Sequence, residues 1–315
     1  MHPEDSFLRT LIRGMRQAYA RGDNAMAYAR SQLASSGHAG NTVAATLVAY
    51  DLQAGSYVEH ARSHPAVTEG WGAQLATILD PLLPDAGSLL EVGCGEATTL
   101  ASVVEHLEIL SPLRRVEPLG FDISWSRISV ANHWLAEHRR AARLFVADLF
   151  HIPLADGSVD VVYTSHSLEP NGGREREAIA ELLRVARSVV VLVEPCFELA
   201  GAEARARMEA HGYVRGLQEA AESLGAKVVT CRALEFVKNP LNPSGAIVLR
   251  KPAPNLQRGA EPTSPSHTCP VTGAPLESLG DVWWTPELGL AYPIVRGIPL
   301  LSPENVFVAS RIAST

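Results

Sequence analysis

A short apolar run that ends in two closely spaced glycines constrains the fold of this chain more than any other feature. Residues 88–92 read Ser-Leu-Leu-Glu-Val, and Gly93 and Gly95 follow before a helix-forming run begins at Glu96. This order predicts a buried strand, a tight turn and a helix start. Glycine lets the backbone approach a ligand closely, and the helix offers free N–H groups at the same point. We therefore expect a ligand site at the carboxyl end of the first strand of a doubly wound sheet, although such turns also occur as plain connections.

Length, charge and cysteine content limit the classes of protein that the chain can represent. With 315 residues it can bury a sizeable core, and a net charge of −7 gives no electrostatic footprint for extended nucleic acid. No apolar run approaches the roughly 18 residues that span a bilayer, and the polar, acidic start is unlike a signal peptide. We expect a cytoplasmic protein without a membrane partner. None of the four cysteines belongs to a CxxC pair, so neither a disulfide framework nor a zinc site stands out.

Residues 1–82 are predicted to form a helical cap that precedes the sheet. Their apolar residues recur at helical spacing. Lids and packing helices share one amphipathic pattern, so the cap could close over a ligand or only pack on the sheet. The expected helices are one capped by Asp5 or Ser6, one over 24–33, one capped by Asn41, and one that Thr68 opens after a break at Pro65.

From Ser88 onward, short apolar runs alternate with amphipathic helical runs. This alternation predicts an α/β fold with a doubly wound, mainly parallel seven-stranded sheet covered on both faces. The last two strands follow each other closely and predict an antiparallel end. We expect this domain to span residues 83–252. Strands are expected at 88–92, 117–122, 143–147, 159–165, 188–194, 226–232 and 245–250, and helices at 96–107, 124–139, 174–187 and 203–224, the last broken near Gly212.

A proline-rich segment, residues 253–267, separates this domain from the end of the chain. Proline excludes a helix or a central strand, so we expect a linker. Residues 268–315 then form a small β-like unit that contains the pair Trp283-Trp284. A unit of this size builds little core of its own. We expect it to dock on the main domain or on a partner chain.

Two acids follow strands where a nucleoside would need them. Asp122 ends the second expected strand and can accept hydrogen bonds from both ribose hydroxyls. Asp148 follows the third and can accept from an adenine amine. Each acid alone could cap a helix or lie in a solvated turn, but together, after a glycine turn, they favour a nucleoside site. Thr98 stands where a dinucleotide fingerprint requires its third glycine, which favours a ligand without a pyrophosphate.

In this order the motifs resemble those of class I S-adenosylmethionine-dependent methyltransferases of the ubiquinone-biosynthesis type, which have a Rossmann-like fold. Glu91-Val-Gly-Cys-Gly95 resembles the first motif, Gly120-Phe-Asp-Ile-Ser124 the second and Ala147-Asp-Leu149 the third. The resemblance covers about half the chain and implies S-adenosyl-L-methionine as cofactor. Ala97 replaces a frequent third glycine, and residues 109–118 look like an additional loop. The cofactor contacts that the resemblance implies are Glu91, Gly93, Gly95, Asp122, Ile123, Asp148, Leu149 and Ser165.

The end of the chain resembles a second family, the small zinc-ribbon activator subunits of tRNA and translation-factor methyltransferases. Cys269-Pro270 and the run Ala291–Pro299 carry this similarity. Thr272 stands where a second cysteine would complete a zinc knuckle, and no later cysteine exists. A tetrahedral site cannot be assembled from one thiolate. We therefore predict a metal-free unit that stabilises the enzyme or shapes its substrate entrance.

A polar loop, Ser165–Gly173, follows the fourth expected strand and should lie beside the ligand crevice. His166 could act as a general base, because its ordinary pKa of about 6.5 suits neutral pH, and Glu169 would orient the imidazole or bind the acceptor. Alternatively, His166 is only hydrogen-bonded within the loop, and Glu169 caps the helix that begins near Arg174. Asn171 and Glu194, which ends the fifth strand, are expected to contact the methyl acceptor.

The sequence thus predicts a methyltransferase that acts on a hydroxyl or amine of a small molecule or sugar. The acidic charge favours a small acceptor, whereas the tail's resemblance favours RNA or protein. A nicotinamide-dependent oxidoreductase is disfavoured by Thr98. A non-catalytic scaffold that keeps the cofactor fold is the remaining alternative. The sequence does not specify an oligomeric state.

Overall fold

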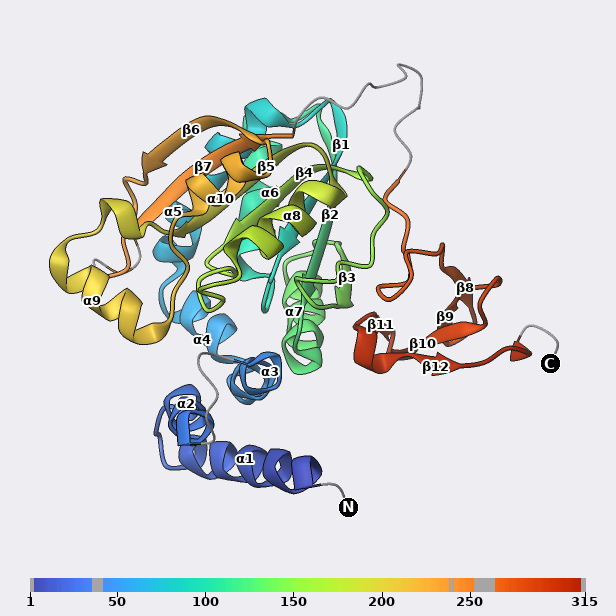
Figure 1. Ribbon diagram of the computed structural model, residues 1–315. Helices are drawn as coiled ribbons and strands as arrows, with labels where there is room; N and C mark the ends of the chain where they lie inside the picture. The colour runs from blue at the N-terminus through green and yellow to red at the C-terminus, as the bar shows by residue number, and fades with distance from the viewer. Residues whose placement is uncertain (1–2, 36–41, 238, 240, 252–263, 313–315) are drawn as a thin grey trace.

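The computed structural model describes residues 3–35, 42–237, 239, 241–251 and 264–312 (Figure 1). Asn41, residue 252 and residues 253–263 of the expected linker lie outside these ranges. Within them, no helix combines the length and apolar character that a membrane span requires.

A seven-stranded sheet with the order β3-β2-β1-β4-β5-β7-β6 forms the centre of the molecule. Strands β1 to β5 pair in parallel, and β7 pairs antiparallel with both β5 and β6, which confirms the predicted antiparallel end. All seven expected strands form, with bounds shifted by at most two residues. The strands are β1 (Ala86–Val92), β2 (Arg115–Asp122), β3 (Arg143–Val146), β4 (Val159–Ser165), β5 (Ala186–Pro195), β6 (Lys227–Ala233) and β7 (Ser244–Arg250).

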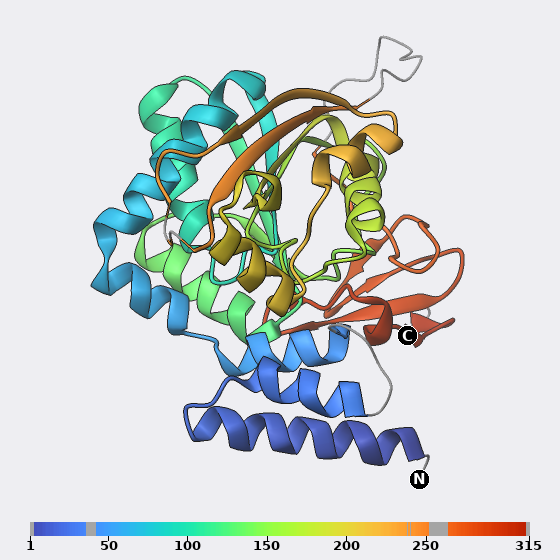
Figure 2. The same ribbon diagram turned by 60° about the vertical axis from the view of Figure 1, so that its left-hand side comes forward.

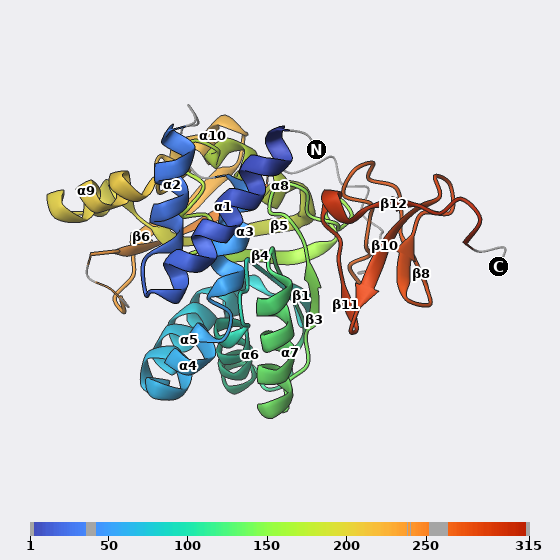
Figure 3. The ribbon, with the colours of Figure 1, turned by 90° about the horizontal axis from the view of Figure 1, so that it is seen from below.

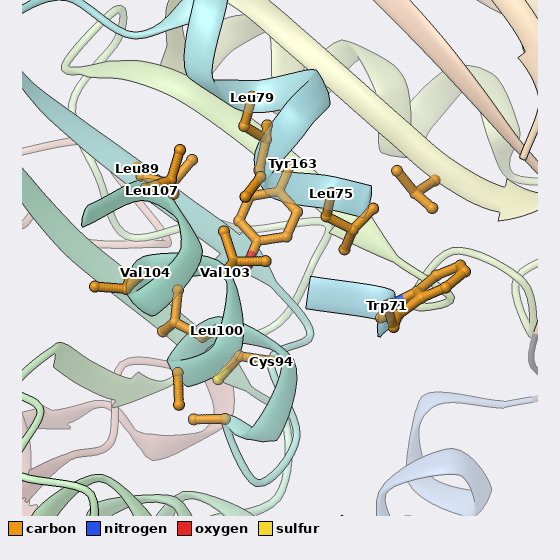
Figure 4. Close-up of a cluster of buried hydrophobic side chains, with 14 of the residues drawn as sticks. Trp71, Leu75, Leu79, Leu89, Cys94, Leu100, Val103, Val104, Leu107 and Tyr163 are labelled. Atoms are coloured by element: carbon orange, nitrogen blue, oxygen red, sulfur yellow. The ribbon is translucent and has the colours of Figure 1, made fainter. Parts of the chain in front are cut away.

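Helices cover both faces of this sheet because its strands are apolar on both sides (Figures 1 and 2). Adjacent residues of β1 show the division: Leu89 packs in the core on one side and Leu90 in the core on the other. The first core contains Trp71, Leu75 and Tyr163 (Figure 4). It is covered by α4 (Ser56–Ser63), α5 (Pro65–Leu79), α6 (Thr98–Leu110) and α7 (Trp125–Glu137), and the second core by α8 (Glu175–Val185) and α10 (Leu217–Ser223).

Several helix boundaries differ from the sequence-based predictions. The helix α5 begins at Pro65 instead of Thr68, because proline is tolerated at the first helical position, where the N–H has no partner. The expected helix over 203–224 is two helices, α9 (Ala202–His211) and α10, separated at Gly212 and Gly216, which both have positive φ. The short helix α4 was not predicted.

The expected additional loop at residues 109–118 is not a loop for most of its length. The helix α6 continues to Leu110 and β2 already begins at Arg115. The turn between them is fixed by Asp80, whose carboxylate accepts a hydrogen bond from the Ser111 hydroxyl and pairs with Arg114. A carboxylate far away in the sequence therefore shapes this connection.

Three helices precede α4 and pack around a small core of their own (Figure 2). They are α1 (Pro3–Ala20), α2 (Ala25–Ser35) and α3 (Val43–Leu52). The helix α1 begins at Pro3, earlier than the predicted caps Asp5 or Ser6. Asp51 at the end of α3 accepts hydrogen bonds from the Ser124 hydroxyl at 2.7 Å and the Ser126 N–H at 3.2 Å, so this bundle is joined to the start of α7.

The C-terminal unit lies against the β3 edge of the large sheet (Figure 3). Leu300 bridges in parallel to Val146, and the N–H of Leu301 donates to the Val146 carbonyl at 2.8 Å. His267 is buried between the rings of Phe145 and Trp283. The unit thereby covers an edge strand that would otherwise offer unpaired backbone groups. Its strands are β8 (Glu277–Leu279), β9 (Val282–Trp284), β10 (Leu290–Val295), β11 (Ile298–Pro299) and β12 (Phe307–Val308).

Cys269, the one cysteine of the turn that resembles a zinc knuckle, is bonded to another side chain of the protein. Cys269 is buried, and its Sγ lies 3.1 Å from the Tyr292 hydroxyl. Among the described residues, no group of three His, Cys, Asp or Glu side chains is arranged to hold a metal. The buried thiol of Cys269 therefore has a hydrogen-bond partner within the protein.

We predict that purified protein contains far less than one zinc per chain, because a single thiolate bonded to a phenol cannot complete a tetrahedral site. Elemental analysis after dialysis measures this directly. A stoichiometric zinc that leaves only when the protein unfolds would contradict the prediction.

Candidate functional site

A cavity of about 780 Å³ opens at the carboxyl ends of the first four strands. The sheet side of its wall contains the two glycines of the turn and the acids at the strand ends. The opposite side comes from α2, α3, α4 and the start of α5. All eight residues expected to contact the cofactor line this cavity: Glu91, Gly93, Gly95, Asp122, Ile123, Asp148, Leu149 and Ser165.

The glycine turn leaves no room for side chains. Gly93 and Gly95 have φ values of +65° and +55°, which favour glycine. A Cβ on Gly93 would lie 2.5 Å from the Cβ of Ser167. Ala97 also has a positive φ, +55°, at the N-cap of α6, a conformation that costs an L-residue about 1–2 kcal/mol. The turn is thus kept narrow and left-handed, even where a side chain must be strained.

Asp122 has one hydrogen bond to each carboxylate oxygen and capacity for more. Its Oδ2 accepts from the Gly95 N–H at 3.1 Å, and its Oδ1 from the Ser124 N–H at 2.9 Å. Burial raises the pKa of Asp122 above its ordinary value, while these N–H groups oppose the shift. Each oxygen keeps a further lone pair directed away from these donors. The side chain can therefore accept from two adjacent hydroxyls.

Two further acids sit at strand ends beside Asp122. Asp148 accepts from the Phe150 N–H at 3.0 Å. Glu91 is 2% exposed and accepts from the Tyr163 hydroxyl at 2.9 Å. Burial and the neighbouring Glu91 raise the pKa of Tyr163 well above its ordinary value. Tyr163 thus fixes the Glu91 carboxylate, a role that sequence reasoning did not identify.

A buried ion pair joins the helical cap to the glycine turn, and it was also not predicted. Glu96 is fully buried and accepts from the N–H groups of Gly55 at 2.9 Å and Val58 at 2.7 Å, at the start of α4. Arg127 lies 3.8 Å from Glu96 and donates from Nε to the Tyr50 carbonyl at 2.9 Å. Its Nη2 has no hydrogen bond within the described chain, although Arg127 is 1% exposed and lines the cavity.

The loop after β4 brings His166 and Glu169 together at the cavity wall. His166 Nδ1 lies 3.0 Å from Glu169 Oε2, and Nε2 lies 2.7 Å from the Ser244 hydroxyl. His166 has a φ of +60°, which is uncommon for a residue other than glycine. The Trp71 ring stands edge-on to the imidazole at 5.6 Å, and its indole N–H donates to Ser165 at 3.0 Å.

The two expected acceptor contacts differ in position. Asn171 lines the cavity, although its amide nitrogen donates to carbonyls of its own loop. Glu194 is buried and is not among the described residues that line the cavity. Its carboxylate accepts from the N–H groups of Ser167, Leu168 and Glu169, each at 3.1 Å. Burial raises the pKa of Glu194 to about 7. In this structure Glu194 fixes the backbone of the loop after β4 through these hydrogen bonds.

Residues 89–188, about a third of the chain, match a protein family described as a methyltransferase domain. No curated protein matches the chain. Similar solved structures include an S-adenosylmethionine-dependent methyltransferase from Aquifex aeolicus, with 13% identity over 57% of this chain and 89% of that chain and a TM-score of 0.41. Geranyl diphosphate C-methyltransferase from Streptomyces coelicolor has 12% identity over 57% and 79%, with a TM-score of 0.43.

A third similar structure comes from the complex between the Haloferax volcanii Trm112 methyltransferase activator and a methyltransferase. It has 11% identity over 64% of this chain and 97% of that chain, with a TM-score of 0.48. At TM-scores below 0.5, these similarities decide nothing about function.

The family match identifies residues 89–188 as a methyltransferase domain, and the sheet has the Rossmann-like order of S-adenosylmethionine-dependent methyltransferases. The residues present fit this cofactor. The glycine turn forms a cradle that a Cβ on Gly93 would fill. Asp122, Asp148 and Glu91 place carboxylates, which accept hydrogen bonds from hydroxyl and amine groups, in the wall of the cavity. The cysteine turn of the C-terminal unit, in contrast, shows no matching set of metal ligands among the described residues.

We predict that Asp122→Ala weakens binding of S-adenosylhomocysteine by about 1.5–3 kcal/mol, because two hydroxyls lose a charged hydrogen-bond acceptor. Calorimetric titration measures the affinity, and Asp156→Ala, at an exposed side chain outside the cavity, is the matched control. Equal affinities of Asp122→Ala and wild type would refute the assignment of Asp122 to the ribose.

Proposed function

We propose that the protein transfers the methyl group of S-adenosylmethionine to a hydroxyl or amine of a small molecule or sugar, with Glu169 and His166 handling the acceptor's proton. The observation that carries this proposal is the pair itself. Its two side chains lie 3.0 Å apart in the wall of the same cavity as the cofactor residues. When bound, the cofactor supplies an electrophilic methyl on its sulfonium. The chain's own residues then have to align the acceptor, accept its proton and exclude water.

The hydrogen bonds of the pair favour one distribution of protons. An ionised carboxylate only accepts, so Nδ1 of His166 donates to Glu169, while Nε2 lies 2.7 Å from the Ser244 hydroxyl. Ser244 is 2% exposed, so Nε2 is engaged by a buried partner inside the protein. The Asn242 amide donates to the same Glu169 oxygen at 3.3 Å. This arrangement supports Glu169 as the proton acceptor and His166 as its orienting partner, the reverse of the roles expected from the sequence.

The enclosure of the cavity supports a small acceptor over RNA or protein. Helix α3 contributes Val43, Thr46 and Tyr50 to the wall opposite the strand ends, and α4 contributes Tyr57 and others. A volume of about 780 Å³ lies within the range of roughly 300–1,000 Å³ that is typical of small-molecule pockets. Cofactor and acceptor would share this space, which leaves room for an acceptor of modest size.

We predict that Glu169→Gln lowers the rate of methyl transfer about 100- to 10,000-fold, because a positioned base contributes a factor of this size. His166→Ala should also lower the rate, because Glu169 loses the side chain that orients it. The initial rate is measured as transfer of labelled methyl from S-adenosylmethionine into a small-molecule extract. Affinity for S-adenosylhomocysteine should stay near the wild-type value in both variants.

Glu203→Gln, at an exposed position on α9, is the matched control and should behave as wild type. A near-wild-type rate in Glu169→Gln would remove proton transfer by this pair from the mechanism and leave positioning as the main contribution.

A further inference from the structure

We infer that the methyl acceptor carries a carboxylate or phosphate group, which Arg30 binds at the end of the cavity remote from the glycine turn. This inference rests on the proposed function and specifies its substrate class. It follows from the distribution of charge along the cavity wall.

The acids of the cavity wall are concentrated on the cofactor side. Glu91, Asp122 and Asp148 stand at or directly after the ends of β1, β2 and β3. In the described chain, Glu169 is the one acid that lines the rest of the cavity, and it is paired with His166 at 3.0 Å. Among the described residues, the wall away from the cofactor residues therefore carries a single carboxylate, and it is hydrogen-bonded to His166.

Besides Arg127, two arginines line the cavity, Arg174 against the Phe150 ring and Arg30 on α2, and they differ in their partners. Arg174 already binds Glu177 with two hydrogen bonds of 2.8 and 2.6 Å. Within the described chain, Arg30 of α2 makes one weak contact, from Nη1 to the His211 carbonyl at 3.4 Å. No carboxylate of the described residues lies within 4.0 Å of the Arg30 guanidinium. The described residues thus leave most of the five donors of this half-buried cation without a partner.

The contact with His211 places Arg30 near the far end of the loop after β4, residues 165–173. The Gly172 N–H donates to the carbonyl of Gly212, the residue after His211, at 3.1 Å. The first turn of α3, with Thr42 and Val43, lines the same cavity and adds the positive end of a helix. Both features favour an anion at this end.

The chemistry of guanidinium specifies the ligand group. Its planar fork matches carboxylate and phosphate oxygens and binds them by charge-assisted hydrogen bonds. An acceptor held by its anionic end at Arg30 would extend its hydroxyl or amine toward Glu169. The inferred substrate is therefore a small anionic alcohol or amine.

Binding of inorganic phosphate to protein saturated with S-adenosylhomocysteine tests the inference without knowledge of the acceptor. Thermal shift is measured against phosphate at constant ionic strength, with chloride as the balancing anion. We expect phosphate to stabilise the wild type, and Arg30→Gln to weaken its apparent affinity about 10- to 100-fold, as expected for the loss of a charged hydrogen bond. Arg30→Lys should retain part of the effect, and Arg16→Gln, exposed on α1, should retain all of it.

The outcomes distinguish failure of the anionic acceptor from failure of the proposed function. No phosphate effect in the wild type, or an equal effect in Arg30→Gln, overturns the anionic acceptor but leaves the methyltransferase intact. Failure of the wild type to bind S-adenosylhomocysteine would instead overturn the proposed function. If Arg30 served only to join α2 to α9, Arg30→Gln would lower the melting temperature but leave the stabilisation by phosphate unchanged.

The same expectation applies to real acceptors. A small-molecule extract is passed over an anion exchanger at pH 7, and each fraction is incubated with enzyme and labelled cofactor. Label should appear in compounds that the resin retains, and Arg30→Gln should reduce that transfer. Label in the unretained fraction alone, or in RNA or protein offered separately, would contradict the inference.

Discussion

The buried carboxylate of Glu96 joins the parts of the molecule that form the site. It follows the glycine turn directly, accepts the first free N–H groups of α4, and faces the buried Arg127, which in turn holds the end of α3. A charge in this position is tolerated because donors surround it, and loss of one partner from such a buried pair costs about 3–5 kcal/mol. The helices over the cavity are therefore held by the same turn that forms the cofactor cradle.

The two ends of the chain complete the site in different ways. The N-terminal helices provide the wall opposite the strands and the cation Arg30. The C-terminal unit covers the β3 edge, where Leu301 bonds to Val146, two residues before Asp148. It also contributes Tyr292 and Leu301 to one core and Ile298 to the other. This unit thus stabilises the sheet next to the adenine side of the expected cofactor site, although its own core is small.

Local sequence patterns predicted the sheet, and they predicted which residues lie together at the carboxyl ends of its strands. The strands are short apolar runs, and Gly93, Gly95, Asp122 and Asp148 lie at strand ends, where topology alone brings them together. Contacts between distant segments carry no such signal. Ser244 bonds to His166 across 78 residues, and nothing in the sequence near either residue indicates it. Arg127 looked like an ordinary helix residue. Glu194 was expected to contact the substrate because it ends the fifth strand, but the sequence does not show that the loop after β4 buries it.

The central claim is that the cavity holds S-adenosylmethionine at the glycine turn. Calorimetric titration of the wild-type protein with S-adenosylhomocysteine tests it most directly, with NAD as the comparison. The account predicts saturable binding of one S-adenosylhomocysteine per chain and no binding of NAD. Binding of NAD with no binding of S-adenosylhomocysteine would contradict it.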